Sequence, residues 1–140
     1  MRTWVHLLVS LLLAAILYPT LGWKVLFILA GGVLIDIDHY LWYVHKHKKF
    51  GLIGCYNNFT IEAEKSDWKN VNGILLIFHT IEFLLIMTVM SFYNQIALIL
   101  ALGLFLHYML DIIWIVTVPK RFVTNHSIIY WYIKSRIQKI

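Results

Sequence analysis

Four long hydrophobic runs divide the chain, covering roughly residues 3–21, 23–44, 71–93 and 95–118. A helix rises about 1.5 Å per residue, so about 20 residues cross the roughly 30 Å hydrocarbon core of a bilayer. Each run is long enough, and the pattern predicts four transmembrane helices. The interruptions at residues 19–22 and 93–95 are short, so the first two helices and the last two are expected to form antiparallel hairpins.

Two polar segments complete the pattern. Residues 45–70 form the one substantial loop, and residues 119–140 form a tail rich in basic side chains. In the tail, Ile129, Ile133, Ile137 and Ile140 recur at helical spacing, with basic residues on the other flank. This spacing is typical of an amphipathic helix that lies in the membrane interface. We therefore expect residues 1–140 to form a single all-α membrane domain with an interfacial C-terminal helix.

The composition supports a membrane protein. The chain has 140 residues, of which 61% are hydrophobic and 14% charged, and its mean hydropathy is +0.75. Soluble domains are usually about 45–50% apolar and about 25% charged. Disorder, a coiled coil and an ordinary cytosolic enzyme are therefore excluded.

The positive charges predict the orientation. The formal net charge is +5, and eleven of the twelve Lys and Arg residues lie outside the hydrophobic runs, in the N-terminus, the central loop and the tail. Lys24 is the exception. Because Lys and Arg concentrate on the cytoplasmic side, we expect both termini and the loop to be cytoplasmic in the inner (cell) membrane. The expected partners are membrane lipids, and no nucleic acid is implied.

Ionisable residues interrupt the hydrophobic runs. Four of the seven acidic residues and three of the seven histidines fall inside predicted spans: Asp36, Asp38, His39, His79, Glu82, His107 and Asp111. A charged side chain at the membrane centre costs about 2.5–3.5 kcal/mol even on insertion scales. We therefore expect these residues to face one another, or to share an ion or a water-filled cavity.

Depth and spacing bring these residues together. In the predicted topology all seven lie roughly 8–17 Å below the cytoplasmic end of their helix. The pairs Asp36–His39, His79–Glu82 and His107–Asp111 are spaced i,i+3 or i,i+4 and so share a helix face. Asp38 lies about 200° from Asp36 on a regular helix, which points to a supporting position or a distorted helix. His6, near the cytoplasmic end of the first helix, is expected at the interface.

Imidazole and carboxylate together are typical ligands of borderline divalent metals. We predict one or two divalent ions, with zinc favoured and iron or manganese as alternatives, held by Asp36, His39, His79, His107 and Asp111. Glu82 and Asp38 are the candidate catalytic residues, as a general base or as a further ligand. A proton or ion path, or buried ion pairs that only tie the helices together, are the other interpretations of the same residues.

Two motifs carry a resemblance to a known family. The tract Gly31-Gly32-Val33-Leu34-Ile35-Asp36-Ile37-Asp38-His39 and the later His107-Tyr-Met-Leu-Asp111 resemble the small integral inner-membrane metal-dependent hydrolases of the LexA-binding, inner-membrane-associated type. The H-x-x-x-D element is also similar to that of helical zinc enzymes that hydrolyse phosphoesters. His79 matches a histidine of the family, whereas Ile35 stands where the family commonly has proline. The resemblance implies a helical membrane protein that binds a metal.

These observations lead to three functional hypotheses. The first is a metal-dependent hydrolase of a phosphoester or ester, with a lipid or another amphiphile as substrate near the cytoplasmic interface. The second is a di-iron or di-manganese oxidoreductase, because His and carboxylate pairs on bundled helices also build such sites. The third is a transporter of metal ions or protons.

Overall fold

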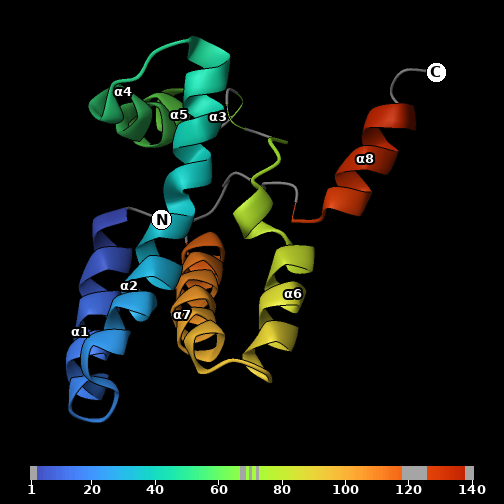
Figure 1. Ribbon diagram of the computed structural model, residues 1–140. Helices are drawn as coiled ribbons and strands as arrows, with labels where there is room; N and C mark the ends of the chain where they lie inside the picture. The colour runs from blue at the N-terminus through green and yellow to red at the C-terminus, as the bar shows by residue number, and fades with distance from the viewer. Residues whose placement is uncertain (1–2, 67–68, 70, 72, 118–125, 138–140) are drawn as a thin grey trace.

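The computed structural model describes residues 3–66, 69, 71, 73–117 and 126–137. All regular elements of this part of the chain are helices, as the all-α prediction requires (Figure 1). In chain order they are α1 (Thr3–Leu21), η1 (Gly22–Val25), α2 (Leu26–Val33), η2 (Leu34–Asp36), α3 (Ile37–His47), α4 (Leu52–Asn57), η3 (Asn58–Glu62), α5 (Ala63–Lys65), η4 (Ile77–His79), α6 (Ile81–Ser91), α7 (Gln95–Thr117) and α8 (Ile128–Ile137).

Two helical stretches are long and apolar enough to cross a membrane, Thr3–His47 and Gln95–Thr117. The first folds back on itself because Gly22 adopts φ +54°, a left-handed conformation that glycine tolerates best. The chain therefore reverses after α1, and α2 returns alongside it (Figure 1). This hairpin matches the predicted helices 3–21 and 23–44, and α7 matches the predicted helix 95–118.

The predicted continuous helix over residues 71–93 is wrong. Residues 73–76 are not helical, η4 is a single 3₁₀ turn, and α6 has only 11 residues, about half a membrane span. Local chemistry explains the break. Thr80 has an extended backbone, and its Oγ1 accepts a hydrogen bond from the Phe83 amide, so that it caps the N-terminus of α6. Gly73, at φ +75°, also departs from helical geometry.

The segment predicted as a polar loop, residues 45–70, is largely helical. Helix α3 continues to His47, and α4, η3 and α5 follow one another from Leu52 to Lys65. Within the predicted tail, helix α8 is confirmed between Ile128 and Ile137, and it projects from the other helices (Figure 1). Residues 118–125 and 138–140, the rest of the tail, lie outside the described residues.

Close packing of α2 against α7 organises the bundle. α2 lies between α1 and α7, and α6 packs on the opposite side of α7 (Figure 1). A Cβ on Gly31 would overlap the carbonyl oxygen of Leu100, and one on Gly103 would overlap that of Ile28. Small residues of this kind allow the backbones of membrane helices to approach closely. The approach brings the polar residues of α7 next to those that follow α2.

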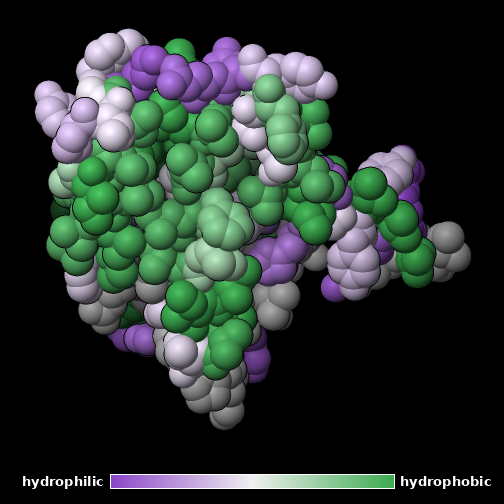
Figure 2. Space-filling view, turned by 90° about the horizontal axis from the view of Figure 1, so that it is seen from below, coloured by the Kyte–Doolittle hydropathy of each residue, from purple (hydrophilic) through white to green (hydrophobic). Residues whose placement is uncertain are grey.

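Large apolar side chains cover much of the outside of the bundle. Exposed examples occur on α1 (Leu8, Leu12), α6 (Leu85, Ile86) and α7 (Phe105). Figure 2 shows one face on which hydrophobic residues predominate. Monomeric soluble proteins rarely expose apolar patches larger than a few hundred Å². The described surface therefore suits contact with an apolar medium.

Candidate metal centre

Four chain segments deliver polar side chains to one buried place. Asp36 ends η2, and Asp38 and His39 occupy the first turn of α3. His79 ends η4, while His107 and Asp111 lie one turn apart on α7. The spacing prediction for these pairs is confirmed, because His39 contacts Asp36 at i,i+3 and His107 contacts Asp111 at i,i+4.

Four of these residues converge through one atom each, and we call this group the candidate centre. Its two imidazole nitrogens, His79 Nε2 and His107 Nε2, are 3.1 Å apart. Asp36 Oδ1 lies 3.4 Å from His79 Nε2 and 3.6 Å from His107 Nε2. Asp111 Oδ2 lies 3.9 Å from His79 Nε2 and 3.3 Å from His107 Nε2. Ligands held about 2.0–2.1 Å from a tetrahedral zinc ion stand about 3.3 Å apart, so the separations among the atoms of Asp36, His79 and His107 fit a divalent ion, whereas the 3.9 Å from Asp111 Oδ2 to His79 Nε2 is longer.

Hydrogen bonds fix which nitrogen of each ring faces the centre. His107 Nδ1 donates to the carbonyl oxygen of Gly32 at 2.9 Å, and His79 Nδ1 donates to Asp38 Oδ2 at 3.0 Å. Since both partners only accept, each neutral ring presents the lone pair of its Nε2. Two lone pairs facing each other at 3.1 Å repel unless a cation, either a proton or a metal ion, lies between them. The two neighbouring carboxylates favour such a cation.

His79 is held in place although it lies outside a long helix. Asp38 Oδ2 accepts hydrogen bonds from both the His79 ring and the Phe78 amide. The Tyr108 hydroxyl lies 2.8 Å from the carbonyl oxygen of Phe78 and 3.0 Å from that of Thr80, and donates to them. These contacts satisfy backbone groups that a helix would otherwise pair. Asp38 therefore orients His79, a role that fits the supporting position expected from its angle.

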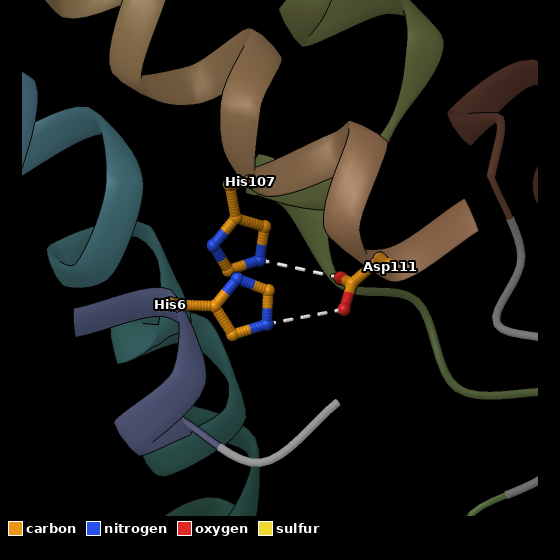
Figure 3. A group of neighbouring side chains, drawn as sticks. All are labelled: His6, His107 and Asp111. Carbon is orange, nitrogen blue, oxygen red and sulfur yellow. Dashed lines mark ion pairs between the residues drawn. The ribbon is translucent and has the colours of Figure 1, made fainter. Parts of the chain in front are cut away.

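His6 belongs to the cluster, and its expected interfacial position is wrong. Its side chain is buried, its ring stacks on His107 with centroids 3.9 Å apart, and its Nε2 lies 3.2 Å from Asp111 Oδ1 (Figure 3). The buried residues of α1 are His6, Ser10 and Ala14, at spacing i, i+4, i+8. This stripe of small and polar residues in a mostly apolar helix is the sequence signal that could have identified the buried face of α1.

His39 lies beside the candidate centre. Its Nδ1 is 3.0 Å from Asp38 Oδ1 and 3.4 Å from Asp36 Oδ1. The ring packs edge-on against Phe59, and the residue lines a cavity together with Asp36, His79 and Asp111. His39 is thus connected to the centre through two carboxylates and reaches the open space in front of it. His39, Asp38 and His79 also lie close enough to one another to hold an ion.

Glu82 does not join the cluster. The pairing of His79 with Glu82 assumed a continuous helix, but α6 begins only at Ile81. Glu82 Oε1 instead accepts a hydrogen bond from the Ser127 hydroxyl at 2.6 Å, and Glu82 Oε2 accepts one from the Ile128 amide at 3.1 Å. Ser127 in turn caps α8 by accepting from the Tyr130 amide. Glu82 therefore connects α6 to the start of α8.

Comparison of the chain with protein-family models, with curated proteins and with solved structures finds no match. The resemblance in the D-x-D-H and H-x-x-x-D motifs therefore stays a prediction. What the described structure establishes is an all-helical chain in which buried His and Asp side chains lie within metal-binding distance of one another.

Proposed function

We propose that the protein is a membrane-embedded metal-dependent hydrolase that cleaves an ester or phosphoester of a lipid or another amphiphile. The observation that supports this most is that the Nε2 atoms of His79 and His107 lie 3.1 Å apart and each lies 3.3–3.9 Å from an oxygen of Asp36 and of Asp111, with each imidazole tautomer set by a hydrogen bond. A divalent ion at this position would act as a Lewis acid that activates water for hydrolysis. Zinc suits the donor set, and iron and manganese are the alternatives.

The residues divide the work in this proposal. The residues that hold the ion are Asp36, His79, His107 and Asp111. Asp38 orients His79 through its Nδ1, and His6 orients Asp111 through its Oδ1. His39 faces the cavity and has the carboxylates of Asp36 and Asp38 at its Nδ1, so it is placed to accept or donate a proton. Glu82, which we predicted as catalytic, receives no part because it connects to α8.

Elemental analysis of the purified protein tests the proposal. We expect at least one divalent ion per chain, hydrolysis of chromogenic esters or phosphodiesters, and loss of both after chelation. Iron with visible absorbance and no hydrolysis would favour the oxidoreductase, and ion flux in proteoliposomes would favour the transporter. Protein that contains no metal and whose melting temperature does not respond to added zinc would contradict the proposal.

Asp38 offers a second test. Asp38→Asn keeps a side chain of similar size but weakens the acceptor that fixes the His79 tautomer. Changes to groups that orient metal ligands typically cost about 10–100-fold in affinity or activity, and we expect a loss in that range with most of the metal retained at saturating zinc. Zinc titration measures the metal affinity, and the hydrolysis rate at saturating zinc measures the activity. The matched control is Glu64→Gln, which alters an exposed carboxylate on α5, and an equal loss in that variant would show that the effect is not local.

The proposed orientation places both termini and residues 45–70 in the cytoplasm, with α8 on the membrane surface. Cys55 is a poor probe, because burial raises the pKa of its thiol to about 11 and only the thiolate reacts quickly. In a Cys55→Ser background, we expect Glu64→Cys to react with an impermeant maleimide only after the cells are opened. Tyr93→Cys, exposed at the opposite turn, should react in intact cells. The reverse labelling pattern would show that the protein has the opposite orientation.

A further inference from the structure

A cavity of about 620 Å³ opens directly in front of the candidate centre. Its lining includes Asp36, His79 and Asp111, together with residues of α3, α4, η3, α6 and α7. Small-molecule sites commonly occupy about 300–1,000 Å³ and combine apolar walls with a few convergent polar groups. This cavity has that size and that construction, so it is the place where a substrate would meet the centre.

Helices α6 and α7 contribute apolar side chains to the cavity wall beside the polar Tyr108 and Asp111. Leu84 lines the cavity from α6, and Ile112 and Ile115 line it from α7. Their immediate neighbours Leu85 and Ile113 do not line the cavity and are exposed on the outside of the same helices. The two helices therefore present apolar side chains both to the cavity and to the surroundings of the bundle. Leu84, Ile112 and Ile115 therefore offer an alkyl chain an apolar contact surface beside the polar groups of the cavity.

We propose that the substrate carries one long alkyl chain that lies along Leu84, Ile112 and Ile115, while its ester or phosphoester head lies against Asp36, His79 and Asp111. This inference rests on the proposed hydrolase function and adds the chain-binding wall and its residues. In this proposal Leu84 sets the specificity for chain length, because its side chain lines the cavity from α6.

The test compares adjacent residues of one helix. Zinc-loaded protein in lipid nanodiscs is assayed with pairs of 4-nitrophenyl esters and 4-nitrophenyl phosphodiesters that differ only in carrying a methyl or a dodecyl group. Leu84→Trp places a larger side chain in the cavity lining, whereas Leu85→Trp places the same side chain outside the cavity. The ratio of variant to wild-type kcat/KM is compared for each substrate, so that partition of the dodecyl compounds into lipid cancels.

We expect Leu84→Trp to lower kcat/KM for the dodecyl substrates at least tenfold and for the methyl substrates less than twofold, with Leu85→Trp unchanged for both. Equal loss for short and long substrates, or no loss for either, would overturn the inference. If Leu84→Trp does not fold or does not retain zinc, Ile112→Trp and its control Ile113→Trp take the place of Leu84→Trp and Leu85→Trp, with the same expected results.

Binding separates this inference from the proposed function. Dodecylphosphonate has a metal-binding head and no bond that the protein can hydrolyse. We expect it to raise the melting temperature of zinc-loaded wild type and Leu85→Trp but not of Leu84→Trp, while methylphosphonate affects all three alike. If no substrate is hydrolysed but this selectivity holds, the hydrolase proposal fails and the chain-binding wall remains. If the selectivity is absent, the chain-binding wall is wrong whatever the hydrolysis results are.

Discussion

Replacing His107 with alanine is expected to remove the bound metal and to destabilise the fold. His107 is buried, donates to the Gly32 carbonyl, stacks on His6 and lies within 3.6 Å of both Asp36 and Asp111. Its loss removes one histidine partner from Asp36 and from Asp111, which keep contacts with His39, His79 and His6, so we expect the fold to lose less than the about 3–5 kcal/mol typical of breaking a buried charge pair. Metal content and melting temperature, measured with and without chelator, report the two effects. His45→Ala, at an exposed position near the end of α3, is the control.

A double variant distinguishes a metal centre from buried ion pairs that only join helices. Replacing both members of a buried pair with apolar residues is often neutral or stabilising, because no charge is left unpaired. If His107 and Asp111 only join helices, changing both to leucine is tolerated. If they bind metal, the double variant loses the metal and its melting temperature no longer responds to chelator. A wild-type melting temperature that chelator does not shift, combined with full activity of the double variant, would contradict the metal centre.

Gly103→Ala is expected to damage the same centre from a distance. The added Cβ would overlap the carbonyl oxygen of Ile28, a backbone atom that cannot move without displacing α2. Overpacking of this kind costs about 1–3 kcal/mol, and here it pushes Asp36 away from His107. We therefore expect a lower melting temperature and weaker zinc binding in detergent, both measured on purified protein.

Gly51→Ala is the matched control for this substitution. A Cβ at Gly51 comes no closer than 4.0 Å to a neighbouring atom, so the same chemical change should leave stability and zinc affinity unaltered. A Gly103→Ala variant that behaves like Gly51→Ala would show that the close approach of α2 and α7 does not control the geometry of the centre.

The sequence predicted the members of the cluster better than the backbone that carries them. Hydrophobic runs locate α1, α2 and α7 because each run is apolar and long enough to cross a bilayer. The prediction failed between residues 73 and 80, where the apolar run is as long but Tyr108, from α7, satisfies the carbonyl groups of Phe78 and Thr80. Long-range pairing of this kind leaves no trace in the local pattern, and the assumed pairing of Glu82 with His79 failed with it.

His6 was missed for a different reason. Its depth was judged by its distance along the chain from the end of its own helix, which says nothing about the rotation of that helix. The orientation of α1 is set by packing of its small and polar stripe, where Ser10 Oγ approaches Gly32 so closely that a Cβ there would overlap it. The stripe marks the buried face of α1, but only the position of the neighbouring helix shows that His6 meets Asp111 and His107.

The distribution of the centre over the chain has a consequence for biosynthesis. The contact between Gly32 and His107 spans 75 residues, and at a synthesis rate of about 5–20 residues per second α7 follows α2 by roughly 4–15 s. During this interval Asp36 and Asp38 have His39 beside them but not His79 or His107, which are made later. In the proposed membrane topology, the hairpin of α1 and α2 therefore enters the bilayer before its acids meet His79 and His107, and a chain that stalls before residue 107 keeps them without these two partners.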